Sequence, residues 1–232
     1  MSGIVVAIDG PAASGKSTTS KEVARRLGYS HLNSGLLYRA IAWTALRDGW
    51  IDDARWFDTE LDQLQLAMLP VPPEFAVQVQ GEVMGPVLSA SEISRQASRV
   101  AALPRVRQRV LEVLRESGSR GSTVCDGRDI GTIVFPEAEL KIFLVAAPEE
   151  RARRRVLELG GDPQGPMLEE EVGRLRDRDA RDASRSIAPL VAAPDAVELD
   201  TTAMRPEQVV DAIVELAIDR GASAVDDAGD PV

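Results

Sequence analysis

Residues 10–18 read GPAASGKST, which matches the pattern G-x-x-x-x-G-K-[ST]. A nearly continuous apolar run, GIVVAID, comes directly before this segment, and apolar residues at helical spacing follow it over residues 17–27. The apolar run is typical of a strand that is buried on both faces of a parallel sheet. A glycine-rich turn between such a strand and a helix gathers backbone N–H groups and the positive end of the helix dipole at one place. The pattern therefore predicts an α/β fold with a phosphate site in its first turn.

The chemistry of this loop indicates a nucleoside triphosphate. Lys16 has the reach to contact the β and γ phosphates, and the Ser17 hydroxyl is a hard oxygen ligand for Mg²⁺. The alternative, an ordinary glycine-rich turn without a ligand, is disfavoured by the strand and the helix that flank the loop. The predicted ATP-binding residues are Gly10, Pro11, Ala12, Ala13, Ser14, Gly15, Lys16, Ser17 and Thr18.

The rest of the chain repeats the alternation of short apolar segments with helical patterns. We expect strands over residues 29–32, 123–125, 140–145 and 196–199, and helices over 36–47, 91–101, 104–118, 148–182 (broken at Gly160-Gly161) and 206–220. Such alternation predicts a doubly wound α/β sheet, with ligands at the carboxyl edge of its strands. Residues 65–90 differ, because prolines and a period of two replace the helical pattern, and they predict a small antiparallel insert.

Composition excludes several function classes. The chain has 232 residues, and its 27 basic and 37 acidic residues give a net charge of −10, which disfavours binding to nucleic acid or to an anionic membrane. The single cysteine permits no internal disulfide and suits a reducing compartment. No apolar run reaches the ~20 residues of a membrane span, and the N-terminus lacks a signal-peptide pattern. We therefore expect a soluble, cytoplasmic protein.

Arginine is concentrated in one region. A solvated helix face is the ordinary interpretation of such a run, and a general preference for arginine is another, since only three of the 27 basic residues are lysine. A third interpretation is a lid that neutralises a transferring phosphoryl group and excludes water. Arg178, Asp182 and Arg185 have the spacing of one helix face, which favours the lid. The arginines of the region are Arg151, Arg153, Arg154, Arg155, Arg174, Arg176, Arg178, Arg181 and Arg185.

Two other classes of triphosphate-binding protein fit less well. A GTPase switch needs an N-K-x-D motif to read guanine, and the chain contains no Asn-Lys pair. A motor or transporter ATPase usually has a long apolar strand that ends in Asp, and the segment that ends at Asp126 is short for that. Neither pattern is therefore met well.

Six separated segments together resemble the bacterial cytidylate kinases over about residues 3–220. They are IDGPAASGKST, NSGLLYRA, SRVAALPRVR, CDGRDIGTIVFP, KIFLVA and RDARDASRSIAPL. The resemblance implies an ATP- and Mg²⁺-dependent monomer that phosphorylates CMP and dCMP. It further implies one kinase domain over 1–220, with a five-stranded parallel core (about 1–32, 102–148 and 186–220), a monophosphate-binding insert (about 33–101) and an arginine-rich lid (about 149–185). Residues 221–232 are expected to be a disordered tail.

The resemblance also implies roles for single residues. The catalytic group comprises Lys16, Arg128, Arg178 and Asp126, of which Asp126 would orient water molecules on Mg²⁺. The cytosine edge would be read by Ser98, Arg107 and Asp129, with Arg185 nearby. The sugar would be held by Arg178 and Asp182, and the acceptor phosphate by Ser34, Arg39 and Arg128, with Tyr38 as a further ligand contact.

Two residues stand apart from these expectations. Asn33 occupies a position where the family often has Asp, which puts a catalytic role for that side chain in doubt. His31 is the only histidine, and without a second metal-ligating side chain near it in the sequence we expect a structural role at a strand end. Two other functions stay open: a kinase of another nucleotide or of a small metabolite such as shikimate, and a slow ATPase switch.

Overall fold

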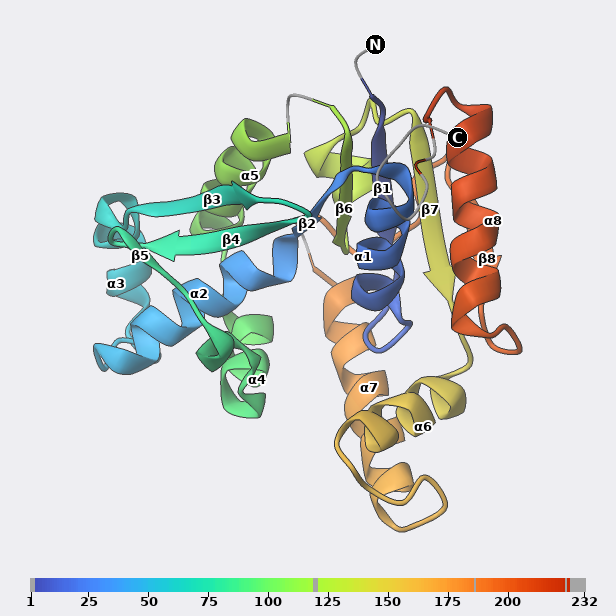
Figure 1. Ribbon diagram of the computed structural model, residues 1–232. Coiled ribbons are helices and arrows are strands. Elements are labelled where there is room, and N and C mark those ends of the chain that lie inside the picture. The colour runs from blue at the N-terminus through green and yellow to red at the C-terminus, as the bar shows by residue number, and fades with distance from the viewer. Residues whose placement is uncertain (1–2, 119–120, 186, 224, 226–232) are drawn as a thin grey trace.

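Figure 1 shows the computed structural model, which describes residues 3–118, 121–185, 187–223 and 225. Within these residues, five parallel strands form the centre of the sheet in the spatial order β2-β6-β1-β7-β8. They are β1 (Val5–Asp9), β2 (Ser30–Asn33), β6 (Thr123–Gly127), β7 (Leu140–Val145) and β8 (Val197–Asp200). The predicted α/β fold with a parallel core is confirmed.

The register of these strands brings three loops to one edge of the sheet. Asp9, the last residue of β1, lies opposite Gly127 of β6 and Phe143 of β7. Parallel strands end at a common edge of the sheet. This edge therefore holds three neighbouring segments: the loop after β1, the loop after β6 and the start of the helix that follows β2. This edge is where the sequence predicts the ligands.

Each face of the sheet carries its own apolar core. Val6 and Ile8 of β1 pack with α1 (Lys16–Leu27) and α8 (Pro206–Asp219) on one face. Ala7, between them in the sequence, points to the other face, which α2 and α5 cover. Each large apolar side chain that is fully buried in this way contributes about 1.5–3 kcal/mol, so the alternation along β1 stabilises both layers.

The helices on the second face are α2 (Ser34–Arg47) and α5 (Pro104–Gly118), with α4 (Ser91–Val100) packed on α2. Pro104 occupies the first turn of α5, where its missing N–H leaves no helical bond unmade. A π-helical turn, η3 (Ile130–Val134), follows β6 directly. The sequence patterns predicted the three α-helices to within a few residues.

The predicted antiparallel insert is confirmed, and it is joined to the core sheet. Strands β3 (Leu66–Val71) and β4 (Glu74–Val79) form an antiparallel hairpin, and β5 (Glu82–Val83) pairs with β4. β4 also lies parallel to β2, with a single register pair between His31 and Glu74. Short helices complete this region, namely α3 (Ala54–Thr59), η1 (Leu61–Gln63) and η2 (Pro86–Ser89).

The arginine-rich segment forms two helices that meet the phosphate loop. α6 (Pro148–Glu158) and α7 (Met167–Ala183) are separated by the predicted break at Gly160-Gly161. They lie beyond the carboxyl edge of the sheet in Figure 1, where Ala152 and Leu175 pack against Ala12 of the loop. The expectation that Arg185 shares a helix face with Arg178 is wrong, since α7 ends at Ala183.

The end of the chain is partly packed. Ala222 is buried, and the backbone N–H of Val225 donates to the carbonyl oxygen of Arg26 at 3.0 Å. These two residues differ from the expected disordered tail because they close over the end of α1. Of the expected tail, 221–232, residues 224 and 226–232 lie outside the described residues. In the described part of the chain, none of the helices combines the length and the apolar character that a membrane crossing requires.

Candidate active site

The loop between β1 and α1 presents backbone N–H groups to an anion, apart from that of Ala12, which donates to Asp179. Gly10 has a φ of +151°, and a Cβ there would lie 2.2 Å from the carbonyl oxygen of Leu144, so no other residue fits. Ala13 and Gly15 also have positive φ angles, of 57° and 88°, which curl the chain into the first turn of α1. No side chain caps this helix, and its first turn holds no acidic residue. The N-terminus is therefore a ready anion site.

Lys16 is folded back onto this loop. Its Nζ donates to the carbonyl oxygen of Pro11 at 2.6 Å and contacts Ser14 Oγ at 3.2 Å. Burial lowers the pKa of Lys16 well below its ordinary value, and the positive charge of Arg128 lowers it further. A bound phosphate would favour the charged ammonium again, so this side chain is set to respond to a polyanion.

Ser17 and Asp126 form a second polar group beside the loop. The hydroxyl of Ser17, which is exposed, donates to Asp126 Oδ2 at 2.8 Å. Asn33 Nδ2 donates to Ser17 Oγ at 3.1 Å, and Ser34 Oγ donates to the backbone oxygen of Asp126 at 2.8 Å. The ring of His31 approaches the other oxygen of Asp126 at 2.7 Å. The carboxylate of Asp126 is thus contacted from α1 and from β2, one oxygen by each.

This donor set fits magnesium. Mg²⁺ prefers hard oxygen ligands and usually takes only one or two protein groups, the remainder being water and substrate phosphates. Ser17 and Asp126 supply a hydroxyl and a carboxylate beside the phosphate loop. No group of three or more metal-ligating His, Cys, Asp or Glu side chains occurs in the described residues, which is compatible with such a partly hydrated ion.

Arginines gather between the loop and the lid. Burial lowers the pKa of Arg178 to about 10, and the charge of Arg128 adds to this effect. Arg178 Nε is buried and has no hydrogen-bond partner in the structure. Burial, together with the charge of Arg155, also lowers the pKa of Arg39. A group of half-buried guanidinium cations with an unpartnered donor is a place where an anion binds favourably.

Asp182 holds two of these cations in place. The carboxylate is 1 % exposed, and it accepts a bond from Arg128 Nε at 3.0 Å and another from Arg185 Nη2. Arg185 therefore reaches the site although it lies past the end of α7. Burial lowers the pKa of Arg185. The lid and the loop after β6 are connected here by charge-assisted hydrogen bonds.

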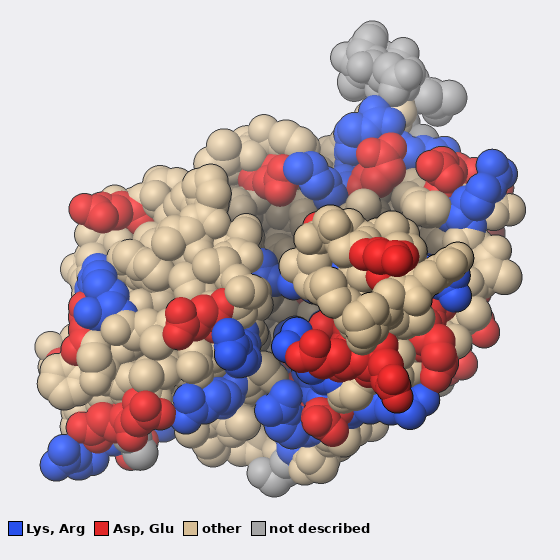
Figure 2. All heavy atoms as spheres, turned by 90° about the horizontal axis from the view of Figure 1, so that it is seen from below, with Lys and Arg blue, Asp and Glu red and all other residues tan. Residues whose placement is uncertain are grey.

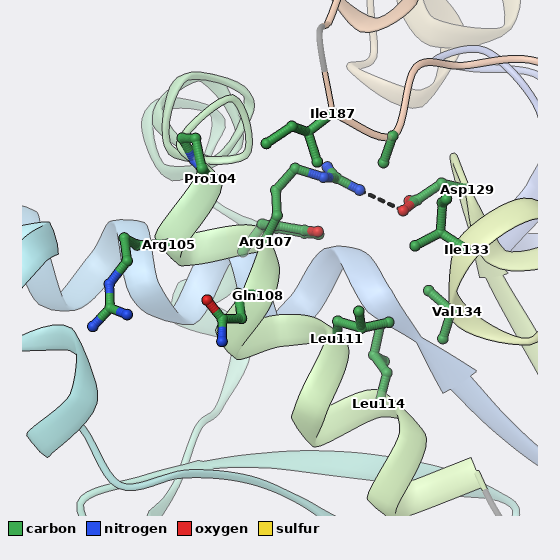
Figure 3. Close-up of a pocket in the computed structure, with 12 residues that line it drawn as sticks. Pro104, Arg105, Arg107, Gln108, Leu111, Leu114, Asp129, Ile133, Val134 and Ile187 are labelled. Carbon is green, nitrogen blue, oxygen red and sulfur yellow. Dashed lines mark hydrogen bonds and ion pairs between the residues drawn. The ribbon is translucent and has the colours of Figure 1, made fainter.

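A pocket of about 300 Å³ lies beside this cluster, between α5 and the loop after β6. Figure 3 shows the ion pair of Arg107 and Asp129 at its wall, and both side chains are buried. The guanidinium of Arg107 also lies 5.8 Å from the ring centre of Tyr38. Burial raises the pKa of Tyr38, so its hydroxyl stays protonated. A planar ligand would find a charged pair, an aromatic ring and apolar side chains here.

The structure thus brings most of the predicted residues together and separates a few. Ser98 lies on α4 and does not line this pocket, although its Oγ is buried without a partner. Thr18 is exposed on α1. The remaining predicted residues are connected by the bonds above or by charge: Lys16 interacts with Arg128, Asp126 and Arg178, and Arg185 interacts with Arg107 and Tyr38.

Sequence reasoning missed Asp9. Its carboxylate accepts hydrogen bonds from the backbone N–H groups of Ile130, at 2.9 Å, and Gly131, at 2.8 Å. Burial raises the pKa of Asp9 to about 6. Because these bonds hold the start of η3, they fix the position of Asp129, which directly precedes it. An acidic residue at the end of an apolar strand was the available signal.

A contact between the lid and the phosphate loop was also missed. Asp179 of α7 accepts a hydrogen bond from the backbone N–H of Ala12 at 3.2 Å and pairs with Arg151 at 2.5 Å. Arg151 in turn donates to the carbonyl oxygen of Ala12 at 2.9 Å. Both polar groups of one loop residue are therefore bonded to the lid.

The charge on the surface follows this arrangement. Figure 2 looks onto the carboxyl edge of the sheet and shows a hollow between the insert and the lid, with basic side chains at its rim. Acidic residues are spread over the insert and the lid in this view, and some adjoin the basic residues at the rim. A chain of net charge −10 therefore presents a basic cleft.

Comparison with known proteins agrees with this geometry. A model of the cytidylate kinase family matches residues 6–219. The chain is 43 % identical over 221 residues to a cytidylate kinase of Chloroherpeton thalassium, covering 93 % of this chain and 94 % of that one. It is also 43 % identical over 219 residues to a cytidylate kinase of Chlorobaculum tepidum, covering 92 % of each.

Among solved structures, an uncharacterized protein from Eubacterium ventriosum matches 93 % of this chain and 98 % of its own, with a TM-score of 0.50 and 12 % identity. At that identity the likeness concerns the fold alone. The family model and the relatives carry more weight, because they span almost the whole chain. On these matches the predicted resemblance is confirmed, and the chain belongs to the cytidylate kinase family.

Proposed function

We propose that this chain transfers the terminal phosphoryl group of ATP to the phosphate of CMP and of dCMP. A phosphate oxygen of the acceptor attacks the γ phosphorus, the bond to the β–γ bridging oxygen breaks, and ADP leaves with the electron pair. The observation that carries the proposal is the group of half-buried arginines, Arg39, Arg128 and Arg178, which interact by charge with one another and with the phosphate-loop Lys16 or Asp126, beside the Arg107–Asp129 pocket. It supplies positive charge where two phosphate chains would meet.

The donor end rests on the loop after β1. The backbone N–H groups of the loop and Lys16 would bind the triphosphate of ATP. Mg²⁺, when bound, neutralises phosphate charge, and Ser17 and Asp126 are the residues that would hold it and its water. The acceptor is already an oxyanion, so positioning and charge neutralisation carry the catalysis without a strong general base.

The acceptor end rests on charge and shape. Arg39, Arg128 and Ser34 would bind the acceptor phosphate, and Arg178 and Asp182 would hold the sugar and close the site. Asp129 is an acceptor that suits the amino group of cytosine, whereas uracil presents an oxygen at that position. Arg107 would donate to the remaining acceptors of the cytosine edge. The pocket thus supports CMP over UMP.

The compartment, the oligomeric state and the moving parts of the enzyme can also be proposed. Cys125 is buried in the core, and the absence of a second cysteine suits a reducing compartment, so we place the enzyme in the cytoplasm. A monomer is proposed, as the resemblance to the cytidylate kinases implies. The insert and the lid, about residues 33–101 and 149–185, would be the two parts that close on the nucleotides.

A coupled assay of ADP release tests the proposal directly. Purified protein with ATP and Mg²⁺ is mixed in turn with CMP, dCMP, UMP, AMP and GMP. We expect fast ADP release with CMP and dCMP, slower release with UMP, and little with the purines. ADP release that no acceptor accelerates would contradict the proposal and favour a slow ATPase. A rate increase only with another acceptor would favour a different kinase.

A further inference from the structure

The single histidine lies inside the metal end of the site. His31 is 4 % exposed, and its Nε2 is 2.7 Å from Asp126 Oδ1. In the parallel pairing of β2 and β6, His31 lies opposite Val124 and Asn33 lies opposite Asp126. Side chains two residues apart on a strand share a face, so the pairing of the strands brings the ring and the carboxylate to the same side of the sheet.

The direction of this hydrogen bond is fixed by chemistry. An ionised carboxylate only accepts, so Nε2 of His31 carries the hydrogen and donates it to Asp126. The second oxygen of Asp126 accepts from the Ser17 hydroxyl at 2.8 Å. With one donor on each oxygen, the plane of the carboxylate is held and cannot rotate without losing a bond.

Asn33 makes this orientation more important. Its side chain is a neutral amide that donates to Ser17 Oγ at 3.1 Å, so it adds no negative charge beside the loop. Among the described residues, the negative charge in contact with Ser17 then comes from the carboxylate of Asp126. If Asp126 turned away, the proposed magnesium site would keep only uncharged oxygen ligands from the protein.

We propose that His31 is a positioning residue, whose ring N–H holds Asp126 Oδ2 toward Ser17 and toward the magnesium ion that accompanies the triphosphate. The inference rests on the proposed function for the identity of the metal. Groups that orient a metal's ligands commonly change metal affinity by about 10–100-fold when they are removed. His31 is buried among packed residues, and a purely structural role is the competing explanation.

Gln and Met separate the two explanations, because they have nearly the same length and differ in the donor group. In His31→Gln the side-chain amide can donate to Asp126, whereas in His31→Met it cannot. Thr44→Val is the matched control: Thr44 is 2 % exposed and bonds only within α2, at Ala40. It removes a buried polar group of similar burial away from the site.

The test measures metal binding without turnover. Paramagnetic Mn²⁺ serves as the probe, and its binding to the complex of each variant with ADP is followed by electron spin resonance. Calorimetry gives the affinity for ADP without metal, and thermal unfolding checks the fold. We expect His31→Met to weaken Mn²⁺ binding by about tenfold or more, with metal-free ADP binding unchanged. His31→Gln and Thr44→Val should keep the wild-type Mn²⁺ affinity.

Two results would overturn the inference. One is an unchanged Mn²⁺ affinity in folded His31→Met, and the other is an equal loss in folded His31→Gln and His31→Met. If His31→Met does not fold, His31→Asn replaces it, since its amide is too short to reach Asp126, and the same two outcomes apply.

The proposed function can fail separately from this inference. If wild-type protein does not phosphorylate CMP while the Mn²⁺ result holds, the acceptor is wrong and the role of His31 stands. If CMP is phosphorylated and the Mn²⁺ affinity does not depend on the donor group, the role of His31 is wrong and the kinase stands.

Discussion

The donor end and the acceptor end of this site are built in different ways. At the donor end, the backbone of residues 10–16 is shaped by glycines and by close packing against Leu144, so its geometry exists before any ligand arrives. At the acceptor end, long arginine side chains are held by carboxylates such as Asp182 and Asp129. The first end is rigid because it is main chain. The second consists of long side chains, and we expect its charged pairs to exchange partners when a substrate enters.

The strongest test of this comparison removes Lys16, the charged side chain that the phosphate loop itself supplies. We expect Lys16→Ala to lower kcat by about a hundredfold or more, because a charge that neutralises the transferring phosphoryl group is lost. The protein should stay folded, since the substitution removes the side-chain bonds to Pro11 and Ser14 while the positive-φ turns of the loop remain. Steady-state kinetics with saturating CMP and circular dichroism measure both effects.

Lys21→Ala is the matched control for Lys16, because Lys21 lies on the same helix and makes an exposed ion pair with Glu74. It should keep the wild-type rate. Near-normal turnover in Lys16→Ala would remove the loop from the proposed reaction.

The next prediction concerns the base-reading pair. Asp129→Asn replaces a carboxylate that suits the amino group of cytosine, and Arg107→Ala removes its partner. Each should lower the ratio of kcat/KM for CMP over UMP by about tenfold, in line with the discrimination of one paired contact. Arg99→Ala, at an exposed ion pair with Asp52, should leave the ratio unchanged. An unaltered ratio in both pocket variants would place the base elsewhere.

The prediction for Asp182 concerns the KM for CMP. Asp182→Asn weakens two charge-assisted bonds, to Arg128 and Arg185, and the proposed contact with the sugar. We expect KM for CMP to rise by about tenfold, as for the loss of a hydrogen bond to a charged group, while KM for ATP changes little. The exposed Asp177→Asn on the same helix is the control. Equal changes in both KM values would contradict the division into two ends.

The smallest effect on catalysis and the clearest effect on stability are expected at Asp9. Its pKa is about 6 in the folded protein, against 3.8 for an unperturbed Asp. The folded state therefore binds this proton more tightly, and the contribution of Asp9 to stability is fully present below about pH 4 and is lost as the pH rises through 6. Asp9→Asn should remove up to about 3 kcal/mol of this pH dependence.

Urea unfolding at several pH values between 4 and 7 measures that dependence. The exposed Asp58→Asn should follow the wild-type profile. A profile of Asp9→Asn that is as steep as that of the wild type would show that the carboxylate is not perturbed by burial.

The two ends also differ in how far the sequence predicted them. The phosphate loop is a local pattern, so its residues, its strand and its helix were all predicted from a continuous segment. Asp182 and Arg128 are 54 residues apart, and their bond depends on how the lid packs. The resemblance supplied the names of such residues but not their partners. Asp9 and His31 escaped functional assignment because their roles arise from strand pairing, which a single strand's pattern does not encode.

The pairing of β2 with β4 has a mechanical consequence. The hairpin of the insert joins the core sheet at the single register pair of His31 and Glu74, where the backbone N–H of His31 donates to the carbonyl oxygen of Pro73 at 2.9 Å. If the insert rotates as CMP enters, the strain falls on the main chain of the residue whose ring holds Asp126. The backbone of His31 would then connect the insert to the sheet while its ring supports the carboxylate at the metal site. Binding of CMP could in this way change the position of Asp126 at the ATP end through a single residue.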